Sequence, residues 1–234
     1  MNRGRLDSDK AARLLEAAGS LARQRGLRGV TVAEIAERAH VGKGTVYLYW
    51  DTKEDLFYEL FARDFIAVAR DYADQLGAHP DLVRPHRLCP LMARTTLARP
   101  FVRAARAHDG HVLGLLADHP ATQHLLDIMG PEAMLAAILP AWRSHGMARS
   151  DQDPERQMYA LRSVMLGFFE LVSSRTAPPP LDLAYSVLAD TVRAVVETPQ
   201  EPSDEDLVSV ARTAIEILDN AQKQVLRLLA DTDD

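Results

Sequence analysis

Cysteine is almost absent from this chain: Cys89 is the only one in 234 residues. An intrachain disulfide is therefore impossible, and a zinc site built on thiolates is not expected. Long apolar runs are also lacking, because no stretch approaches the roughly 18 residues needed to cross a bilayer. Residues 1–10 do not have the apolar segment of a signal peptide. These absences predict a cytoplasmic protein without a membrane partner.

Strand-like alternation of polar and apolar residues is missing over any useful length, and helical spacing recurs throughout instead. The chain has neither a glycine loop that could cradle phosphate nor a nucleophile motif. Hydrophobic residues make up 47% and charged residues 26%, a balance typical of folded globular proteins. The sequence predicts an all-α protein that is not an enzyme and carries no cofactor or metal.

Negative charge dominates overall, with a net charge of −6, yet it is unevenly distributed. Residues 1–50 hold nine Lys or Arg against five Asp or Glu, a net of +4, so residues 51–234 carry −10. A polyanion at close range responds to the local charge more than to the total. The first fifty residues are the candidate surface for nucleic acid.

A helix-turn-helix is predicted near the start of the chain. Gly26 is placed to end a first helix that Asp7 or Ser8 caps, and Thr31 opens a second helix with Glu34 at capping-box spacing. Residues 40–42 leave room only for a tight turn before a short helix at 43–50. Two helices joined by about three residues fit this motif.

The remaining helices define a larger second region. A long linking helix is expected over about 52–76, two strong helices over 154–174 and 181–197, and an extra C-terminal helix over about 203–231. The prolines at 90, 100, 120, 131 and 140 are expected to divide the middle into short helical segments, since proline resists a helix interior. The predicted domains are a DNA-binding domain at 1–51 and a helical ligand-binding and dimerisation domain at 52–234.

Aromatic residues are scarce, at 6% of the chain, but three of them crowd into the stretch YLYW at 47–50. Val46 and Trp50, one turn apart, are expected to face the core. Tyr47 and Tyr49 are then free to donate to phosphate. Small residues at 42 and 44 leave room for base edges, while Lys43 supplies charge.

The stretch LLEAAGSLARQRGLRGVTVAEIAERAHVGKGTVYLYWDTKEDLF, at 14–57, closely resembles the N-terminal domain of the TetR family of bacterial repressors. The resemblance implies DNA contacts at Thr31, Lys43, Gly44, Thr45, Tyr47, Tyr49 and Lys53. Thr52 joins this set because it lies at a helix start, where free amides favour phosphate. Three positions depart from the family pattern: Ala22 replaces Phe, His40 replaces Gly, and Gly42 replaces a capping Ser.

The resemblance also implies a homodimer whose C-terminal body combines a ligand cavity with a four-helix interface. The interface is predicted on the apolar stripe of the helices at 154–174 and 181–197, which consists of Met158, Leu161, Met165, Phe168, Leu188, Val192 and Val195. The alternative is that this stripe belongs to an intrachain core. Gly167 would let helices approach. The residues predicted to line the pocket come from the proline-divided region and are Met92, Phe101, Met129, Met134 and Trp142. The alternative is that each of them packs in the core.

These features predict a repressor released from a pseudo-palindromic operator by a small, largely apolar effector. Two alternatives remain open. The heptad spacing of the last helix allows a helical protein-interaction module. A dense set of metal-ligand residue types resembles that of metal-dependent HD phosphohydrolases, although without diagnostic spacing: His79, His86, His108, Asp109, His111, Asp118, His119 and His124.

Overall fold

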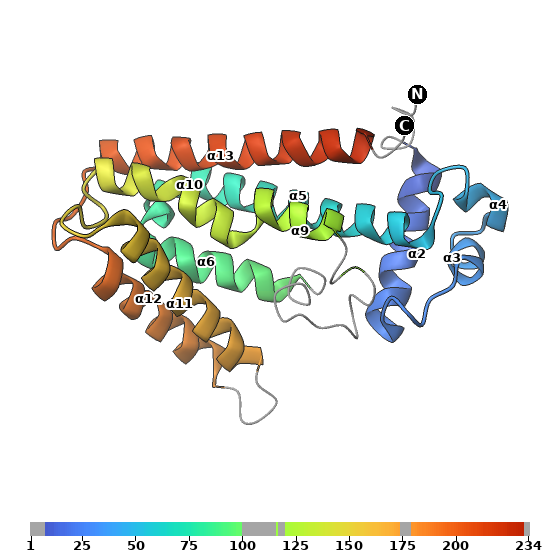
Figure 1. Ribbon diagram of the computed structural model, residues 1–234, viewed down its shortest axis with the longest axis horizontal. Coiled ribbons are helices and arrows are strands. Elements are labelled where there is room, and N and C mark those ends of the chain that lie inside the picture. The colour runs from blue at the N-terminus through green and yellow to red at the C-terminus, as the bar shows by residue number, and fades with distance from the viewer. Residues whose placement is uncertain (1–7, 100–115, 117–119, 174–178, 232–234) are drawn as a thin grey trace. The chain divides into compact units, whose positions relative to one another are not determined.

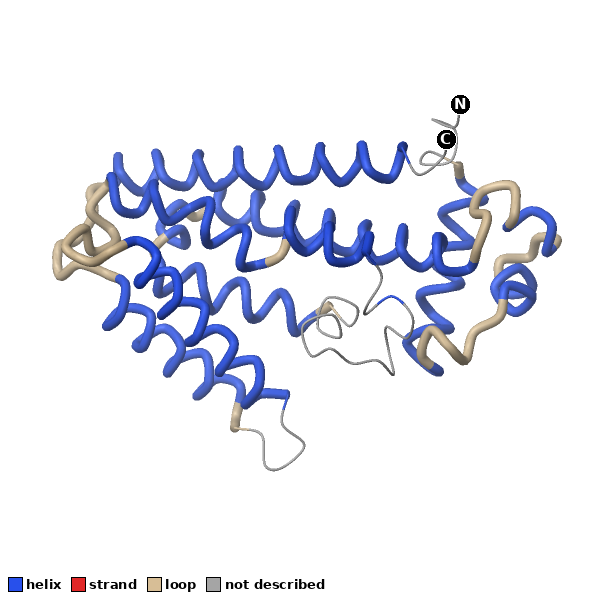
Figure 2. Tube along the Cα trace, viewed as in Figure 1, coloured by secondary structure: helices blue, strands red, loops and turns tan. Residues whose placement is uncertain are grey.

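The protein is helical in the computed structural model, which describes residues 8–99, 116, 120–173 and 179–231 (Figures 1 and 2). The described residues contain no β-strand, only an isolated antiparallel bridge between Ala148 and Glu197. The predicted all-α fold is confirmed. The chain divides into two compact units, one of residues 1–66, 99–125 and 223–234, the other of residues 67–98 and 126–222.

The first unit contains α2 (Asp9–Arg25), α3 (Val32–Arg38), α4 (Lys43–Val46) and the start of α5 (Lys53–Ala78). Their boundaries follow the predicted local signals. Ser8 caps α2 through a hydrogen bond from the Ala11 amide, and Gly26 ends it with a φ of 73° that suits glycine. Large side chains from all four helices are buried in this unit, among them Leu14, Ile35 and Leu56.

Helix α4 is shorter than predicted. The sequence predicted a helix over 43–50, but regular α-helix ends at Val46. The chain continues in turns, in which the Leu48 and Tyr49 amides donate to the carbonyls three residues before them, over 3.3 and 3.0 Å. The Trp50 amide donates to the Val46 carbonyl at 3.0 Å, so this turn still brings Val46 and Trp50 to the same buried side.

The second unit combines the rest of α5 with η1 (Pro80–Val83), α6 (Pro85–Ala98), α10 (Pro131–Ser144), α11 (Pro154–Ser173), α12 (Leu181–Val196) and most of α13 (Asp204–Asp231). Helices α11 and α12 lie side by side, and α12 also packs on α6 (Figure 1). Helix α9 (Pro120–Met129) spans the division between the units.

The prediction that proline divides the middle region was wrong at two positions. Pro90 lies inside α6 and Pro140 inside α10. Each proline removes one amide donor, but the buried apolar faces on which these helices pack outweigh that loss. Pro131 behaves as predicted, because it occupies the start of α10, where an amide would be unpaired anyway. Pro100 lies outside the described residues.

Helix α13 packs against its own chain. Its buried residues recur every three or four positions, including Val210, Ala214, Leu218 and Val225. Gln222 accepts a hydrogen bond from Arg70 of α5 at 3.3 Å. The apolar seam is thus occupied within the chain, which disfavours a separate partner helix.

One helical stretch of the described residues, Ala121–Ser144, is long and apolar enough to cross a membrane, with a mean hydropathy of 1.3. It comprises most of α9 together with α10, which meet at Gly130. Of its most apolar 18-residue window, 39% is buried inside the protein, and core helices of folded domains have the same composition. The stretch is weak evidence for a membrane span.

Candidate nucleic-acid interface

Thr31 holds the start of α3 in a complete capping box. Its amide and hydroxyl both donate to Glu34 Oε2, at 2.9 and 2.8 Å, and its Oγ1 accepts from the Glu34 amide at 3.3 Å. These bonds from Thr31, followed by the Arg25 guanidinium at 2.6 Å, lower the pKa of Glu34. The predicted cap is confirmed, and the hydroxyl proton of Thr31 is already engaged in it.

The turn between α3 and α4 contains a strained residue. His40 has a φ of 55°, in the left-handed region that non-glycine residues seldom adopt. The Val41 amide then donates to the Ala36 carbonyl at 3.0 Å, which closes the turn. The sequence flagged this position because the family usually has glycine there, and the structure shows why glycine would suit it.

The tip of α4 is bare. Gly42 caps the helix without a side-chain hydrogen bond, and Lys43 and Gly44 are exposed. A Cβ added to Gly44 would meet no atom within 4 Å, so the fold of this chain has room for a side chain there. A glycine costs up to about 1 kcal/mol relative to alanine in a helix interior. Packing within this unit therefore does not require glycine at this site.

The crowded rings divide as predicted between core and surface. Val46 and Trp50 are buried, with 1% and 2% of their surface exposed, whereas Tyr47 is 47% exposed. Tyr49 is half-buried, and its hydroxyl lies 2.9 Å from the Ser8 hydroxyl at the start of α2. Leu48, which the sequence analysis did not select, is 74% exposed beside the bare tip. The sequence signal that could have identified Leu48 as a candidate contact is its position between Tyr47 and Tyr49.

A buried carboxylate anchors this segment to α5. The Trp50 indole donates to Glu59 Oε2 at 2.8 Å, and Arg63 Nη2 lies 2.7 Å from Glu59 Oε1. Glu59 is only 1% exposed. Because Trp50 ends the segment that carries Lys43, Tyr47 and Tyr49, this bond fixes where the bare tip lies on its own unit.

Two further predicted contacts lie at the start of α5. The Thr52 hydroxyl donates to Asp55 Oδ2 at 2.6 Å and accepts from the Asp55 amide at 3.1 Å, which confirms the predicted helix start at Thr52. Lys53 Nζ donates to the carbonyls of Leu27 and Val30 at 3.3 and 3.2 Å. An ammonium has three donors, so one remains for a phosphate.

The pocket candidates are not gathered in one place. The second unit holds a small apolar cavity of about 30 Å³, which Met92 and Met134 line. The full lining among the described residues is Tyr72, Leu76, Leu88, Met92, Met134, Ile138, Ala214, Ile217 and Leu218. Met129 and Trp142 are buried away from it, Trp142 donating to the Val83 carbonyl at 2.8 Å. Phe101 lies outside the described residues.

The predicted interface stripe faces inward. Five of its seven residues are buried within one chain: Leu161, Met165, Phe168, Leu188 and Val192. Met158 and Val195 are half-buried. This burial fits the alternative of an intrachain core, because the 3.6-residue period places these residues on one face of each helix, toward the protein's own core. The outward faces of the same helices carry other apolar residues, including Leu166, Leu171, Leu183 and Val187.

The histidine-rich set does not assemble a metal centre among the residues that the structure describes, which contain no group of three or more metal-ligand side chains. His79 and His124 are exposed, and His86 is buried against Glu197. His108, Asp109, His111, Asp118 and His119 lie outside the described residues.

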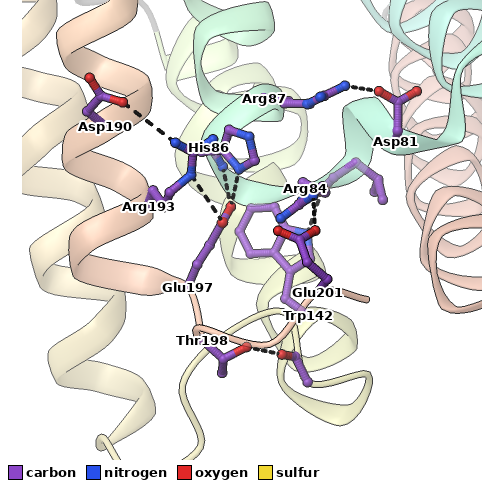
Figure 3. Close-up of polar contacts among 12 residues, drawn as sticks. Asp81, Arg84, His86, Arg87, Trp142, Asp190, Arg193, Glu197, Thr198 and Glu201 are labelled. Carbon is purple, nitrogen blue, oxygen red and sulfur yellow. Dashed lines mark hydrogen bonds and ion pairs between the residues drawn. The ribbon is translucent and has the colours of Figure 1, made fainter. Parts of the chain in front are cut away.

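His86 and Glu197 form a buried pair that joins α6 to the end of α12 (Figure 3). Glu197 Oε1 accepts from the His86 amide at 2.8 Å and lies 2.7 Å from Nδ1 of its ring. Burial alone would raise the pKa of Glu197, but the hydrogen bonds and charge of His86 outweigh it and leave that pKa below its ordinary 4.5. The pair holds the second unit together.

Glu197→Gln is expected to cost about 1.5–3 kcal/mol of unfolding free energy at pH 7, because a charged acceptor is lost. A lowered carboxyl pKa stabilises the fold above its ordinary value and loses that effect as pH falls through the folded value. The difference between variant and wild type should therefore shrink below pH 4.5. Urea unfolding at several pH values measures it. The exposed Glu201→Gln is the control and should show little change; a pH-independent difference at Glu197 would contradict the account.

This geometry is that of a helix-turn-helix protein whose bare, positively charged tip is suited to a DNA groove. Residues 14–60 match the bacterial regulatory proteins of the tetR family. This match identifies the N-terminal helix-turn-helix as a DNA-binding domain of the kind found in tetR-family transcriptional regulators.

One curated relative and two solved structures illustrate what the chain is similar to. The chain is 28% identical over 153 residues to the HTH-type transcriptional repressor KstR of Rhodococcus jostii strain RHA1, covering 60% of this chain and 72% of that protein. A tetR-family regulator from Mesorhizobium loti MAFF303099 has the same fold, with a TM-score of 0.56, 19% identity, and 81% and 97% of the two chains covered. A regulator from Shewanella sp. PV-4 gives a TM-score of 0.52 with 18% identity, over 81% and 98% of the chains.

Proposed function

We propose that this regulator is a cytoplasmic repressor that binds a pseudo-palindromic operator as a homodimer and is released by a small, largely apolar effector. Residues 1–51 form its DNA-binding domain, and residues 52–234 its ligand-binding and dimerisation domain. The observation that carries the proposal is Gly44, an exposed helical glycine that the fold of the chain does not require.

The contacts with DNA centre on this tip. Lys43, Gly44 and Thr45 approach base edges, and the phenol of Tyr47 donates to a phosphate oxygen. Thr31, Tyr49, Thr52 and Lys53 already hydrogen-bond within the chain, so they position the tip and offer their remaining capacity to the phosphate backbone. Leu48 adds an apolar surface suited to a thymine methyl group.

Operator binding is tested with duplexes that the wild-type protein selects from a random-sequence library. Affinity should fall steeply with salt, because phosphate contacts displace counterions. Lys43→Ala should weaken binding about tenfold and reduce the salt dependence by about one ion for each protomer of the dimer, and Tyr47→Phe should weaken binding less. Both variants should unfold like wild type. Full affinity in both would show that the contacts lie elsewhere.

The homodimer forms through the outward faces of α11 and α12. Leu166 and Leu171 on α11 are 53% and 64% exposed, and Leu183 and Val187 on α12 are 57% and 54% exposed. Gly167 lies on the same outward side, and a Cβ added there would meet nothing within 4 Å. Its small size lets a partner helix approach closely. A dimer presents two tips about 34 Å apart, one turn of DNA.

Leu183→Glu combined with Val187→Glu is expected to convert the dimer to a monomer, because two carboxylates per chain would be buried without partners. Operator affinity should fall about a hundredfold, since the two half-sites no longer bind as a linked pair. Sedimentation velocity and operator titration measure the two effects. Val208→Glu, at a position 47% exposed on α13, is the matched control and should stay dimeric. A dimeric double variant would place the interface elsewhere.

Release by effector requires a link between cavity and tip. Helix α5 is continuous from Lys53, beside the tip, to Ala78, and its residues Tyr72 and Leu76 line the apolar cavity. An effector that binds one conformer better than the other shifts the population. A hundredfold loss of operator affinity requires about 2.7 kcal/mol of differential binding.

A further inference from the structure

We propose that the effector is an uncharged amphiphile: an apolar body in the cavity, with one neutral hydrogen-bonding group placed on the hydroxyl of Thr96. This rests on the proposed release by a small molecule and names the chemical class of that molecule.

The cavity excludes ionic groups. The described residues that line it are aliphatic, with the exception of Tyr72. The Tyr72 hydroxyl donates to the Met92 carbonyl at 3.1 Å, so its proton is engaged. A carboxylate or ammonium placed here would lose its hydration without gaining an opposite charge, a cost that apolar contacts do not offset.

Thr96 supplies the polar end. It follows Leu88 and Met92 at intervals of four along α6, so the three residues share one face of the helix, and the first two line the cavity. Its side chain is buried, with 1% of its surface exposed, and its Oγ1 has no hydrogen-bond partner among the residues that the structure describes. A helical threonine usually donates to the carbonyl four residues before it. For Thr96 that carbonyl belongs to Met92, which already accepts from Tyr72.

An unpaired buried hydroxyl costs roughly 1–3 kcal/mol, so it needs an explanation. A ligand hydroxyl, ketone or ester supplies one, because each can hydrogen-bond a threonine without carrying charge. The neighbouring Thr95 makes the contrast clear: its hydroxyl donates to the Leu91 carbonyl at 3.0 Å.

The cavity must expand to admit a ligand. Its present volume of about 30 Å³ holds about two water molecules. Met92 and Met134 form part of its wall, and methionine side chains rearrange easily. Helix α13 closes another side with Ala214, Ile217 and Leu218, so the C-terminal helix also shapes which ligands fit.

Three probes of one shape test the class: 2-phenylethanol, ethylbenzene and phenylacetate. Their dissociation constants are measured by ligand-observed NMR on the full chain. In wild type the alcohol should bind at least about tenfold more tightly than the carboxylate. Thr96→Val keeps the shape but removes the hydroxyl, so the ratio of alcohol to hydrocarbon affinity should fall about tenfold, equal to about 1.4 kcal/mol. Thr95→Val is the matched control and should keep the wild-type ratio.

The same set of variants also tests where the probes bind and whether each variant folds. Ala214→Phe fills the cavity and should abolish binding of all three probes. Thr96→Val without ligand should be at least as stable as wild type, because it removes an unpaired polar group. Four results would each overturn the assignment of the ligand class to this cavity. The affinity ratio could stay unchanged in Thr96→Val, or the carboxylate could bind as tightly as the alcohol. Binding could survive Ala214→Phe, or none of the three probes could bind.

The two proposals can fail separately. Operator affinity is measured with and without saturating 2-phenylethanol. Binding through Thr96 that leaves operator affinity unchanged would refute release by ligand and keep the ligand class. Release of the operator by phenylacetate but not by the alcohol would refute the proposed ligand class and keep release by ligand.

Discussion

Replacing Gly44 with phenylalanine is expected to lower operator affinity about a hundredfold or more, equal to about 2.7 kcal/mol, while leaving the free energy of unfolding nearly unchanged. Apart from the adjacent residues and the backbone of its own helix, no described atom lies within 4 Å of a Cβ at this exposed position, so a side chain there projects into solvent. In the complex it would project toward the groove. The bulk would hold the tip away from the base edges and break several contacts at once.

Gly44→Ala separates this steric effect from backbone entropy. Alanine should stabilise the free protein by up to about 1 kcal/mol, because it restricts the unfolded chain and favours helix. Its single methyl group should reduce operator affinity far less than phenylalanine does. Urea unfolding and operator titration give both quantities. If Gly44→Phe unfolds normally and still binds the operator like wild type, this tip does not enter the groove.

Glu59→Ala is expected to destabilise the protein by about 2–3 kcal/mol and to weaken operator binding even at temperatures where the variant remains folded. The substitution leaves the buried Trp50 indole donor without an acceptor, which costs most of that free energy. Arg63 loses its ion pair with Glu59 too, but its side chain is 32% exposed and is hydrated by water. The freed Trp50 no longer fixes the segment that carries Tyr47 and Lys43.

Glu59→Gln is the matched control, because its amide oxygen can still accept from the indole. It should cost about 1 kcal/mol, the difference between a charged and a neutral acceptor. Thermal unfolding followed by Trp50 fluorescence reports both variants, with Trp142→Phe as the background that isolates that signal. Equal losses in the two variants would show that the charge of Glu59, and not its bond to Trp50, stabilises the segment.

Local signals were sufficient for much of the fold. Capping at Ser8, Thr31 and Thr52, the end of α2 at Gly26 and the extents of α11 and α12 all follow from residues within one or two turns. The same holds for the inward Val46 and Trp50, since apolar spacing within the segment identified them. A helix boundary depends on hydrogen bonds between residues that lie close together in the sequence, so the local sequence is enough to predict it.

Other features depended on distant parts of the chain. Periodicity found the apolar stripe of α11 and α12, but it could not tell a protein core from a partner surface, and the stripe proved internal. It also did not predict that α6 and α10 continue through Pro90 and Pro140. The signal from proline is local, whereas the packing that outweighs it comes from other helices.

The sequence by itself determined the helical class, the helix-turn-helix and the small, charged tip at Lys43 and Gly44. Only the tertiary structure decided that Glu59 holds Trp50, that Glu197 pairs with His86, and that the described part of the chain offers the Thr96 hydroxyl no partner. The reason is sequence distance: caps and turns form between residues three or four positions apart, whereas His86 and Glu197 are separated by 111 positions. Nothing in the neighbouring residues of either one specifies the other.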